Sequence, residues 1–111
     1  MTSAKVRVLV IDDSAFNRRS IVKMLESLPN VEVIGYACDG EDGLRKVIDL
    51  QPDLITLDLE MPRMDGFEVL KTVRRDARLS KLPIIMITSR TGEKHKQQAL
   101  ELGVNQFLGK P

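Results

Sequence analysis

Five short apolar segments alternate along this chain with longer stretches in which apolar residues recur every three or four positions. The short segments cover residues 6–11, 31–36, 54–57, 83–87 and 104–108. Such segments predict buried strands, and the stretches between them predict four helices. Strands that alternate with helices favour βαβ units, in which a parallel sheet is covered on both faces. Because crossovers between parallel strands are right-handed, we expect an α/β domain with a doubly wound, five-stranded parallel sheet.

Several residues mark where the expected helices begin and end. Ser14, Asp39 and Thr91 each precede a helical pattern and fit the N-cap position. Stop signals follow three of the helices, at Pro29-Asn30, Gln51-Pro52 and Gly103. The residues expected to face the core are Ile21, Met24, Leu25 and Leu28 in the first helix, Leu44, Val47 and Ile48 in the second, Phe67, Leu70 and Val73 (or Val69 and Val73) in the third, and Ala99 and Leu102 in the fourth.

Length and composition limit the possible classes of protein. The 111 residues, of which 42% are hydrophobic, fit one domain over residues 1–111 with a core of its own. With 17 Lys+Arg against 16 Asp+Glu, the net charge gives no indication of nucleic-acid or membrane binding. No apolar run approaches the roughly 18 residues of a membrane span. Cys38 is the only cysteine, which favours a reducing, cytoplasmic setting.

The chain stops just after its fifth expected strand. The helix that should cover that strand is therefore expected to be absent, either because the chain is truncated or because it is a fragment.

Acidic residues follow two of the expected strands. Asp12 and Asp13 come after residues 6–11, and Asp58 comes after residues 54–57. In a sheet of order 2-1-3-4-5 these strands are neighbours, so their carboxylates converge at the edge where such sheets bind ligands. Close carboxylates are costly unless they share a cation or bind protons, and hard oxygen ligands suit Mg²⁺. A carboxylate in this position can also act as a nucleophile and form an aspartyl-phosphate.

Two further polar residues lie at the same edge of the expected sheet. Lys110 follows the fifth strand and could pair with a phosphoryl oxygen, and Thr88 ends the fourth strand with a hydroxyl donor. A metal ion and an ammonium would neutralise charge as a phosphoryl group is transferred. Each residue alone has an ordinary explanation as a cap, a solvated turn residue or a β-former. Their combination at one sheet edge favours a functional site.

At these residues the chain resembles the receiver domains of two-component signalling, which have a flavodoxin-like fold. The similar segments span the whole chain and are Val10-Ile11-Asp12-Asp13-Ser14, Leu57-Asp58-Leu59-Glu60-Met61-Pro62-Arg63-Met64-Asp65-Gly66, Ile87-Thr88-Ser89 and Gly109-Lys110-Pro111. The resemblance implies that Asp58 accepts a phosphoryl group from a histidine kinase. It implies Mg²⁺ ligands from the side chains of Asp12, Asp13 and Asp58 and from the backbone carbonyl of Glu60.

The resemblance also implies how such a chain would switch. Thr88 would move toward the phosphoryl group, Lys110 would bind it, and the rotamer of Phe107 would follow activation. Phe107 lacks the hydroxyl of the Tyr that is common at this position. The resemblance implies that the chain catalyses only its own phosphorylation and dephosphorylation, and that it is not a turnover enzyme.

The subfamily resemblance is divided between the two halves of the chain. The first half resembles the receiver of the chemotaxis methylesterase, and the second half resembles receivers fused to chemotaxis-type kinases. We therefore expect a chemotaxis-like or motility pathway. The implied partners are a histidine kinase and a downstream protein or fused output domain, with a homodimer possible on activation and no binding of nucleic acid or membrane.

Three other functions are compatible with parts of the pattern. A receiver that is never phosphorylated could serve as a docking module. An aspartate-nucleophile phosphatase would require a second Asp two residues after the nucleophile, where this chain has Glu60. An FMN binder requires a hydroxyl-rich loop after the first strand and aromatic residues, but that loop is acidic and the chain has no Trp and one Tyr. Glycine patterns for dinucleotides and for P-loops are absent.

The remaining candidates have weaker assignments. Glu60 and Arg90 either pair across the mouth of the site or are separately solvated. His95 is expected to be a surface or edge residue and not a ligand or phosphorelay histidine, and Cys38 is expected to be a small buried residue. Met61 and Met64 are expected to pack around their loop. A basic run is expected to be solvated at the end of the third helix, where the helix dipole favours cations; it comprises Lys71, Arg74, Arg75, Arg78 and Lys81.

Overall fold

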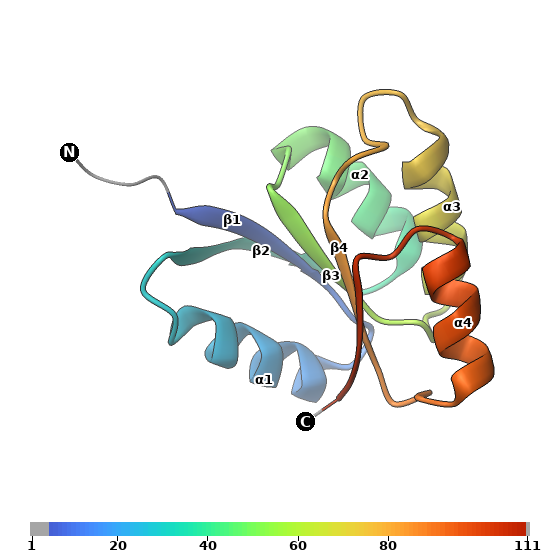
Figure 1. The fold of residues 1–111 in the computed structure, drawn as a ribbon. Coiled ribbons are helices and arrows are strands. Elements are labelled where there is room, and N and C mark those ends of the chain that lie inside the picture. Colours follow the sequence, from blue (N-terminus) through green and yellow to red (C-terminus); the bar gives the residue numbers. More distant parts are fainter. Residues whose placement is uncertain (1–4, 111) are drawn as a thin grey trace.

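The computed structural model describes residues 5–110 and shows the predicted α/β architecture. Its elements are β1 (Val6–Ile11), α1 (Ala15–Glu26), β2 (Val31–Ala37), α2 (Gly40–Leu50), β3 (Leu54–Leu57), α3 (Gly66–Arg75), β4 (Ile84–Thr88), α4 (Glu93–Glu101) and β5 (Gln106–Gly109). All neighbouring strands are parallel, and their order is β2-β1-β3-β4-β5 (Figure 1). The predicted doubly wound sheet and its strand order are therefore confirmed.

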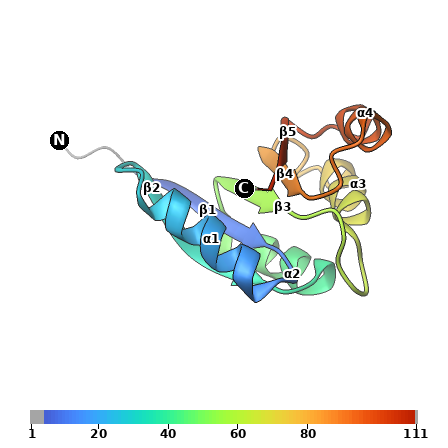
Figure 2. The same cartoon turned by 90° about the horizontal axis from the view of Figure 1, so that it is seen from below.

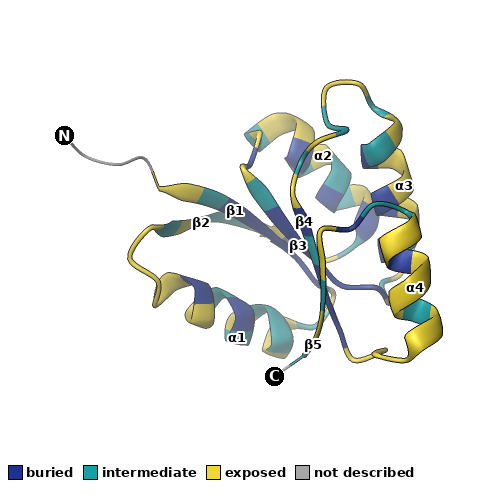
Figure 3. Ribbon diagram, in the orientation of Figure 1, coloured by how far each residue is buried: buried dark blue, intermediate teal, exposed yellow. Residues whose placement is uncertain are grey.

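The helices divide between the two faces of the sheet (Figures 1 and 2). Helix α1 packs beside β1 and β2, where Ile21 and Leu25 join Val8 and Val10 in one apolar cluster. A larger cluster on the other face combines strand residues with side chains from α2, α3 and α4; among its members are Leu9, Ile11, Ile55, Leu57, Ile84, Met86, Val47, Val69, Leu70, Val73 and Ala99. Figure 3 shows that burial is concentrated along the inner strands β1, β3 and β4. Each such fully buried aliphatic side chain contributes about 1.5–3 kcal/mol by removal from water.

The side chains of each strand alternate between these two clusters. On β1, Val8 and Val10 belong to the α1 cluster, whereas Leu9 and Ile11 belong to the larger one. The next residue on the α1 side is Asp12. This period of two determines which strand-end side chains share one face of the sheet.

Three of the four helices have side-chain N-caps. Ser14 accepts a hydrogen bond from the Asn17 N–H at 3.3 Å, and Asp39 accepts one from Asp42 at 2.8 Å, as predicted. Asp65 caps α3 in a reciprocal capping box with Glu68. The prediction for Thr91 is wrong: the N-cap of α4 is Gly92, which has no side chain to make the bond. The turn after β4 is one residue longer than the pattern suggested.

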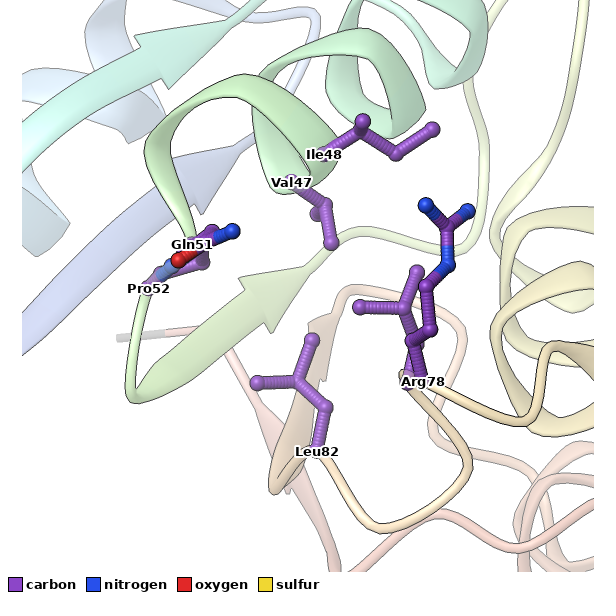
Figure 4. Close-up of a pocket in the computed structure, with 7 residues that line it drawn as sticks. Val47, Ile48, Gln51, Pro52, Arg78 and Leu82 are labelled. Atoms are coloured by element: carbon purple, nitrogen blue, oxygen red, sulfur yellow. The ribbon is translucent and has the colours of Figure 1, made fainter.

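Some residues at helical spacing are not buried. Met24 and Leu28 are each 48% exposed and Ile48 is 47% exposed, so these three core predictions are wrong. Helix α1 packs through the narrower stripe of Ile21 and Leu25, and it ends at Glu26, before Leu28. Ile48 borders a cavity of about 370 Å³ between the end of α2 and residues 78–82 (Figure 4).

Two single-residue predictions also need correction. Cys38 is exposed, not buried, because β2 ends at Ala37 and the chain then turns toward Asp39. Arg74 is not solvated with the rest of its basic run, because its guanidinium donates hydrogen bonds to three backbone carbonyls and to the Asn105 side chain. The other members of the run are exposed.

The strand predictions hold with small shifts. Strand β5 covers Gln106–Gly109, two residues after the predicted start, and β4 covers Ile84–Thr88, one residue after it. Met61 and Met64 pack against the larger cluster as expected. No helix within residues 5–110 has both the length and the apolar character needed to cross a bilayer.

Candidate functional site

Three carboxylates converge at the carboxyl ends of β1 and β3. Asp12, Asp13 and Asp58 each place an oxygen within 4.8 Å of the others. The cause is the register of the two strands, which pairs Ile11 with Leu57 and lets the Asp58 N–H donate to the Ile11 carbonyl at 2.9 Å. Asp12 is 1% exposed and Asp58 is 4% exposed, whereas Asp13 is exposed. The predicted convergence is therefore confirmed.

Asp12 is held by contacts on several sides. Its Oδ1 accepts a hydrogen bond from the Ser14 N–H at 2.9 Å, and its own N–H donates to the Ala37 carbonyl at 3.0 Å. Its carbonyl oxygen accepts from the Arg18 guanidinium at 3.0 Å. Its Oδ2 is buried and accepts no directed hydrogen bond within residues 5–110. The positive group nearest to this oxygen among the described residues is the Lys110 ammonium, at 3.1 Å.

Lys110 reaches the acidic cluster from the end of β5. Its Nζ lies 3.1 Å from Asp12 Oδ2 and 3.4 Å from Asp58 Oδ2. The contact with Asp12 is an ion pair and not a well-directed hydrogen bond, which explains why Oδ2 still lacks a hydrogen-bond donor. Burial lowers the pKa of the Lys110 ammonium, but the two carboxylates outweigh burial and the net pKa is raised. Lys110 is therefore a cation at neutral pH.

The electrostatics of the cluster favour a further cation. Burial, followed by the charge of Asp12, raises the pKa of Asp58 to about 6, although Lys110 acts in the opposite direction. One ammonium against three carboxylates leaves two formal negative charges in a largely buried site. Three converging carboxylates, of which Asp12 and Asp58 are buried, supply hard oxygen ligands of the kind that fit Mg²⁺.

Thr88 and Phe107 occupy another part of the sheet edge. Thr88 ends β4, is fully buried, and accepts a hydrogen bond on Oγ1 from the Arg90 N–H at 3.0 Å. Strand alternation assigns Thr88 to the face of Ile84 and Met86, where Phe107 also packs. The β4–β5 register pairs Met86 with Phe107. The structure thus places the two expected switch residues close to each other, on neighbouring strands.

Glu60 and Arg90 form an ion pair between the loops that follow β3 and β4. Arg90 Nε lies 2.8 Å from Glu60 Oε1, and its Nη2 lies 2.9 Å from Oε2. These hydrogen bonds are the main reason why the pKa of Glu60 is lowered. The pairing alternative is confirmed. His95 is half-buried beside this pair, in a groove of about 400 Å³ that Phe67 also lines.

Arg18 is the contact residue that the sequence predictions did not include. It lies four residues after the N-cap Ser14, so one turn of helix brings it back over Asp12. The only sequence signal for this contact is a basic residue one helical turn after the acidic pair. Exposed arginines in helices give the same signal, so it does not single out Arg18.

Comparisons with known proteins agree with this geometry. The model of the family described as response regulator receiver domain matches residues 8–111. The protein-glutamate methylesterase/protein-glutamine glutaminase 3 of Geobacter sulfurreducens is 60% identical over 107 residues, which are 96% of this chain and 28% of that protein. The chain therefore spans less than a third of this relative.

Solved structures show the same similarity. The response regulator domain of Thermotoga maritima CheB has a TM-score of 0.87 and 39% identity, covering 96% of this chain and 79% of that chain. CheY in a CheX–CheY–BeF3–Mg²⁺ complex from Borrelia burgdorferi gives a TM-score of 0.89 and 29% identity, covering 97% of this chain and 80% of that chain.

Proposed function

The chain belongs to the response regulator receiver family, and on that premise we propose that it is a phosphoacceptor, with Asp58 as the residue that is phosphorylated. The observation that carries this proposal is the convergence of Asp12, Asp13 and Asp58 at one sheet edge, with the Lys110 ammonium beside Asp12 and Asp58.

The proposed reaction transfers a phosphoryl group from the phosphohistidine of a kinase. An ionised Asp58 oxygen attacks phosphorus, the new P–O bond forms as the P–N bond breaks, and the leaving imidazole nitrogen keeps the electron pair and takes up a proton. With a pKa of about 6, Asp58 is ionised at neutral pH. Lys110 lies beside Asp58 Oδ2, where it can pair with negative charge on the transferred group.

The same residues provide a Mg²⁺ site in this proposal. The side chains of Asp12, Asp13 and Asp58 and the backbone carbonyl of Glu60 would hold the ion. Bound Mg²⁺ would supply charge neutralisation for the phosphoryl oxygens. The convergence of the three carboxylates within 4.8 Å supports this assignment, as does the Mg²⁺ complex of a structural neighbour.

The state of Glu60 disfavours the phosphatase alternative. That reaction needs a protonated acid two residues after the nucleophile to protonate the leaving group. In this chain both Glu60 oxygens accept hydrogen bonds from Arg90, and these bonds lower the Glu60 pKa. Glu60 is therefore an ionised carboxylate at neutral pH and has no proton to donate.

The signalling context is part of the proposal. A histidine kinase would phosphorylate the chain in the cytoplasm, and Thr88 and Phe107 would change position in response. The output would be a downstream protein or a fused domain in a chemotaxis-like pathway. The 60% identity to a methylesterase that is more than three times as long favours a fused methylesterase domain. The receiver itself would perform no turnover reaction, and activation could produce a homodimer.

The test is phosphorylation by a small donor. The chain is incubated with Mg²⁺ and acetyl phosphate and weighed by intact mass spectrometry, beside Asp58→Asn and the control Asp49→Asn on the surface of α2. We expect a gain of about 80 Da, one phosphoryl group, in the wild type and in Asp49→Asn. The gain should disappear in Asp58→Asn and when Mg²⁺ is chelated.

Other outcomes would select the alternatives. A chain that folds and binds Mg²⁺ without gaining mass would be a docking module. Steady phosphate release from a general phosphomonoester would indicate a phosphatase.

A further inference from the structure

Arg18 connects the acidic cluster to an aromatic ring on the edge strand of the sheet. Its Nη1 donates to the Asp12 carbonyl at 3.0 Å, and its guanidinium carbon lies 4.7 Å from the centre of the Tyr36 ring. A guanidinium is planar, so it can stack on a ring and donate in its own plane at the same time. A lysine ammonium lacks this geometry.

The ring that Arg18 contacts is also held in place. Tyr36 lies on β2 in register with Val10, and its carbonyl accepts a hydrogen bond from Lys46 at 2.6 Å. The Lys46 ammonium lies 5.5 Å from the centre of the same ring and 3.1 Å from Asp42. Arg18 comes from α1 and Lys46 from α2, so Tyr36 contacts a cation from each face of the sheet.

The contact determines how the Asp12 main chain is held. Asp12 has an N–H bonded to the Ala37 carbonyl, a carbonyl bonded to Arg18, and Oδ1 bonded to the Ser14 N–H. These bonds leave Oδ2 as the buried oxygen without a hydrogen-bond donor, beside Lys110. Without Arg18, the peptide that carries Asp12 loses its only side-chain donor among residues 5–110.

We propose that Arg18 is a positioning residue for the metal site: stacked on Tyr36, it presets the Asp12 carboxylate to receive a divalent cation. This inference rests on the proposed function, in which Asp12 is a Mg²⁺ ligand. Residues that orient a ligand in this way typically affect metal affinity by about 10- to 100-fold.

Two effects of Arg18 on Mg²⁺ binding have opposite signs, which makes the proposal testable. The positive charge of Arg18 repels a cation, so a purely electrostatic role predicts that its removal strengthens Mg²⁺ binding. A positioning role predicts that its removal weakens binding, because Asp12 must then be ordered by the metal itself.

Arg19 provides a matched control. It is the next residue on α1, it is exposed, and it lines the same groove as Arg18. Within residues 5–110 it donates no side-chain hydrogen bond. Arg19→Met therefore removes the same charge from almost the same place without touching Asp12.

The experiment measures Mg²⁺ affinity by titration calorimetry on the whole 111-residue chain. We expect Arg18→Met to weaken binding about tenfold and Arg18→Lys to weaken it although the charge is kept. Arg19→Met should bind at least as tightly as the wild type. Tyr36→Phe, which keeps the ring, should bind normally, and Tyr36→Leu should bind as weakly as Arg18→Lys.

Tyr36 also provides a spectroscopic signal, because it is the only tyrosine in a chain without tryptophan. If Arg18 connects Asp12 to the ring, Mg²⁺ binding should change the tyrosine emission of the wild type and of Arg19→Met. Saturating Mg²⁺ should leave the emission of Arg18→Met unchanged.

Several results would overturn the inference. One is that Arg18→Met binds Mg²⁺ as tightly as the wild type or more tightly. Another is that Arg18→Met and Arg19→Met lose Mg²⁺ affinity equally. If Arg18→Met does not fold, the Tyr36 variants provide the test. Equal Mg²⁺ affinities of Tyr36→Phe and Tyr36→Leu would then overturn the inference. A folded wild type that binds no Mg²⁺ would instead overturn the metal site itself, and this inference with it.

Discussion

Asp58 is the residue in which reactivity and stability are most directly opposed. Its burial beside Asp12 raises its pKa from an ordinary value of 3.8 to about 6. The same burial makes the ionised carboxylate costly to the fold whenever no cation is bound. The proposed nucleophile is therefore a source of instability in the metal-free chain.

This cost predicts a pH-dependent effect of Asp58→Asn. In the metal-free chain, folded Asp58 keeps a proton at pH values where unfolded Asp58 has lost it. The contribution of Asp58 to the wild-type free energy of unfolding therefore falls as the pH rises from about 4 to about 6. Asn carries no charge, so in EDTA the variant should be more stable than the wild type by about 1–2 kcal/mol at pH 7.5, after allowance for solvent screening.

Urea unfolding at the two ends of this pH range measures the effect. The difference between Asp58→Asn and wild type should be close to zero near pH 4. An equal difference at both pH values would mean that packing, and not ionisation, is responsible.

Gly66 packs directly against the backbone of the site. A Cβ at this position would lie 2.3 Å from the Asp58 carbonyl oxygen and 2.9 Å from the Leu59 Cα. Both are backbone atoms, so the strand that carries Asp58 would have to move. We expect Gly66→Ala to lower the free energy of unfolding by about 2–4 kcal/mol, as overpacking at a rigid site does.

Gly35→Ala is the appropriate comparison for Gly66→Ala in chemical denaturation. Its added Cβ would meet the end of the flexible Leu50 side chain at 3.2 Å. This second variant should lose much less stability. Similar losses would show that the close approach to Asp58 has no special cost.

Among the secondary-structure elements, the connections around α3 depend on one side chain. Arg74 lies in the last turn of α3 and donates to the Leu82 carbonyl at 2.7 Å, the Gly103 carbonyl at 2.9 Å and Asn105 Oδ1 at 3.0 Å. Asn105 Oδ1 also accepts from the Ile84 N–H at 2.8 Å. Arg74 thereby ties the segment before β4 to the segment before β5.

We expect Arg74→Ala to lower the free energy of unfolding by about 2–3 kcal/mol, because several half-buried acceptors lose their donor together. Arg74→Lys should restore little of this loss, since an ammonium cannot reach acceptors spread around a planar guanidinium. Arg75→Ala, at the exposed neighbouring position, should stay within about 0.5 kcal/mol of wild type in the same urea titration. A full rescue by lysine would contradict this explanation.

At the scale of the whole molecule, the site exists only because three separate strands end at one edge of the sheet. Asp12 and Asp13 follow β1, Asp58 follows β3, and Lys110 follows β5. An ion that binds there binds the folded chain and not the unfolded one. Metal binding should therefore be coupled to folding as a whole.

Mg²⁺ should stabilise the wild type in a saturable way. At a concentration ten times the dissociation constant, the expected gain is about 1.4 kcal/mol, visible as a rise in Tm. Asp13→Asn should lose most of this gain, whereas Asp49→Asn should keep it. Measurements at constant ionic strength exclude screening, and an equal rise in Asp13→Asn and wild type would indicate general ionic effects.

The sequence by itself determined most of the architecture and the membership of the site. Strand and helix periodicities depend on local composition, and parallel strands joined by helices have few possible arrangements. The polar residues at strand ends then meet at one edge, which is why Asp12, Asp58 and Lys110 could be grouped before any coordinates were known. The caps at Ser14 and Asp39 were equally local, since a cap bonds only within its own turn.

Only the tertiary structure decided how each side chain is used. The spacing of apolar residues along a helix does not show how much of the helix surface the sheet covers. It therefore predicts core positions for Met24 and Ile48, which are exposed. The roles of Arg74 and Arg18 were hidden for a related reason. Most of their acceptors are main-chain carbonyls, whose positions follow from packing and not from residue type. An arginine that holds a loop or the main chain of a site residue therefore has the same sequence signature as one that only faces solvent.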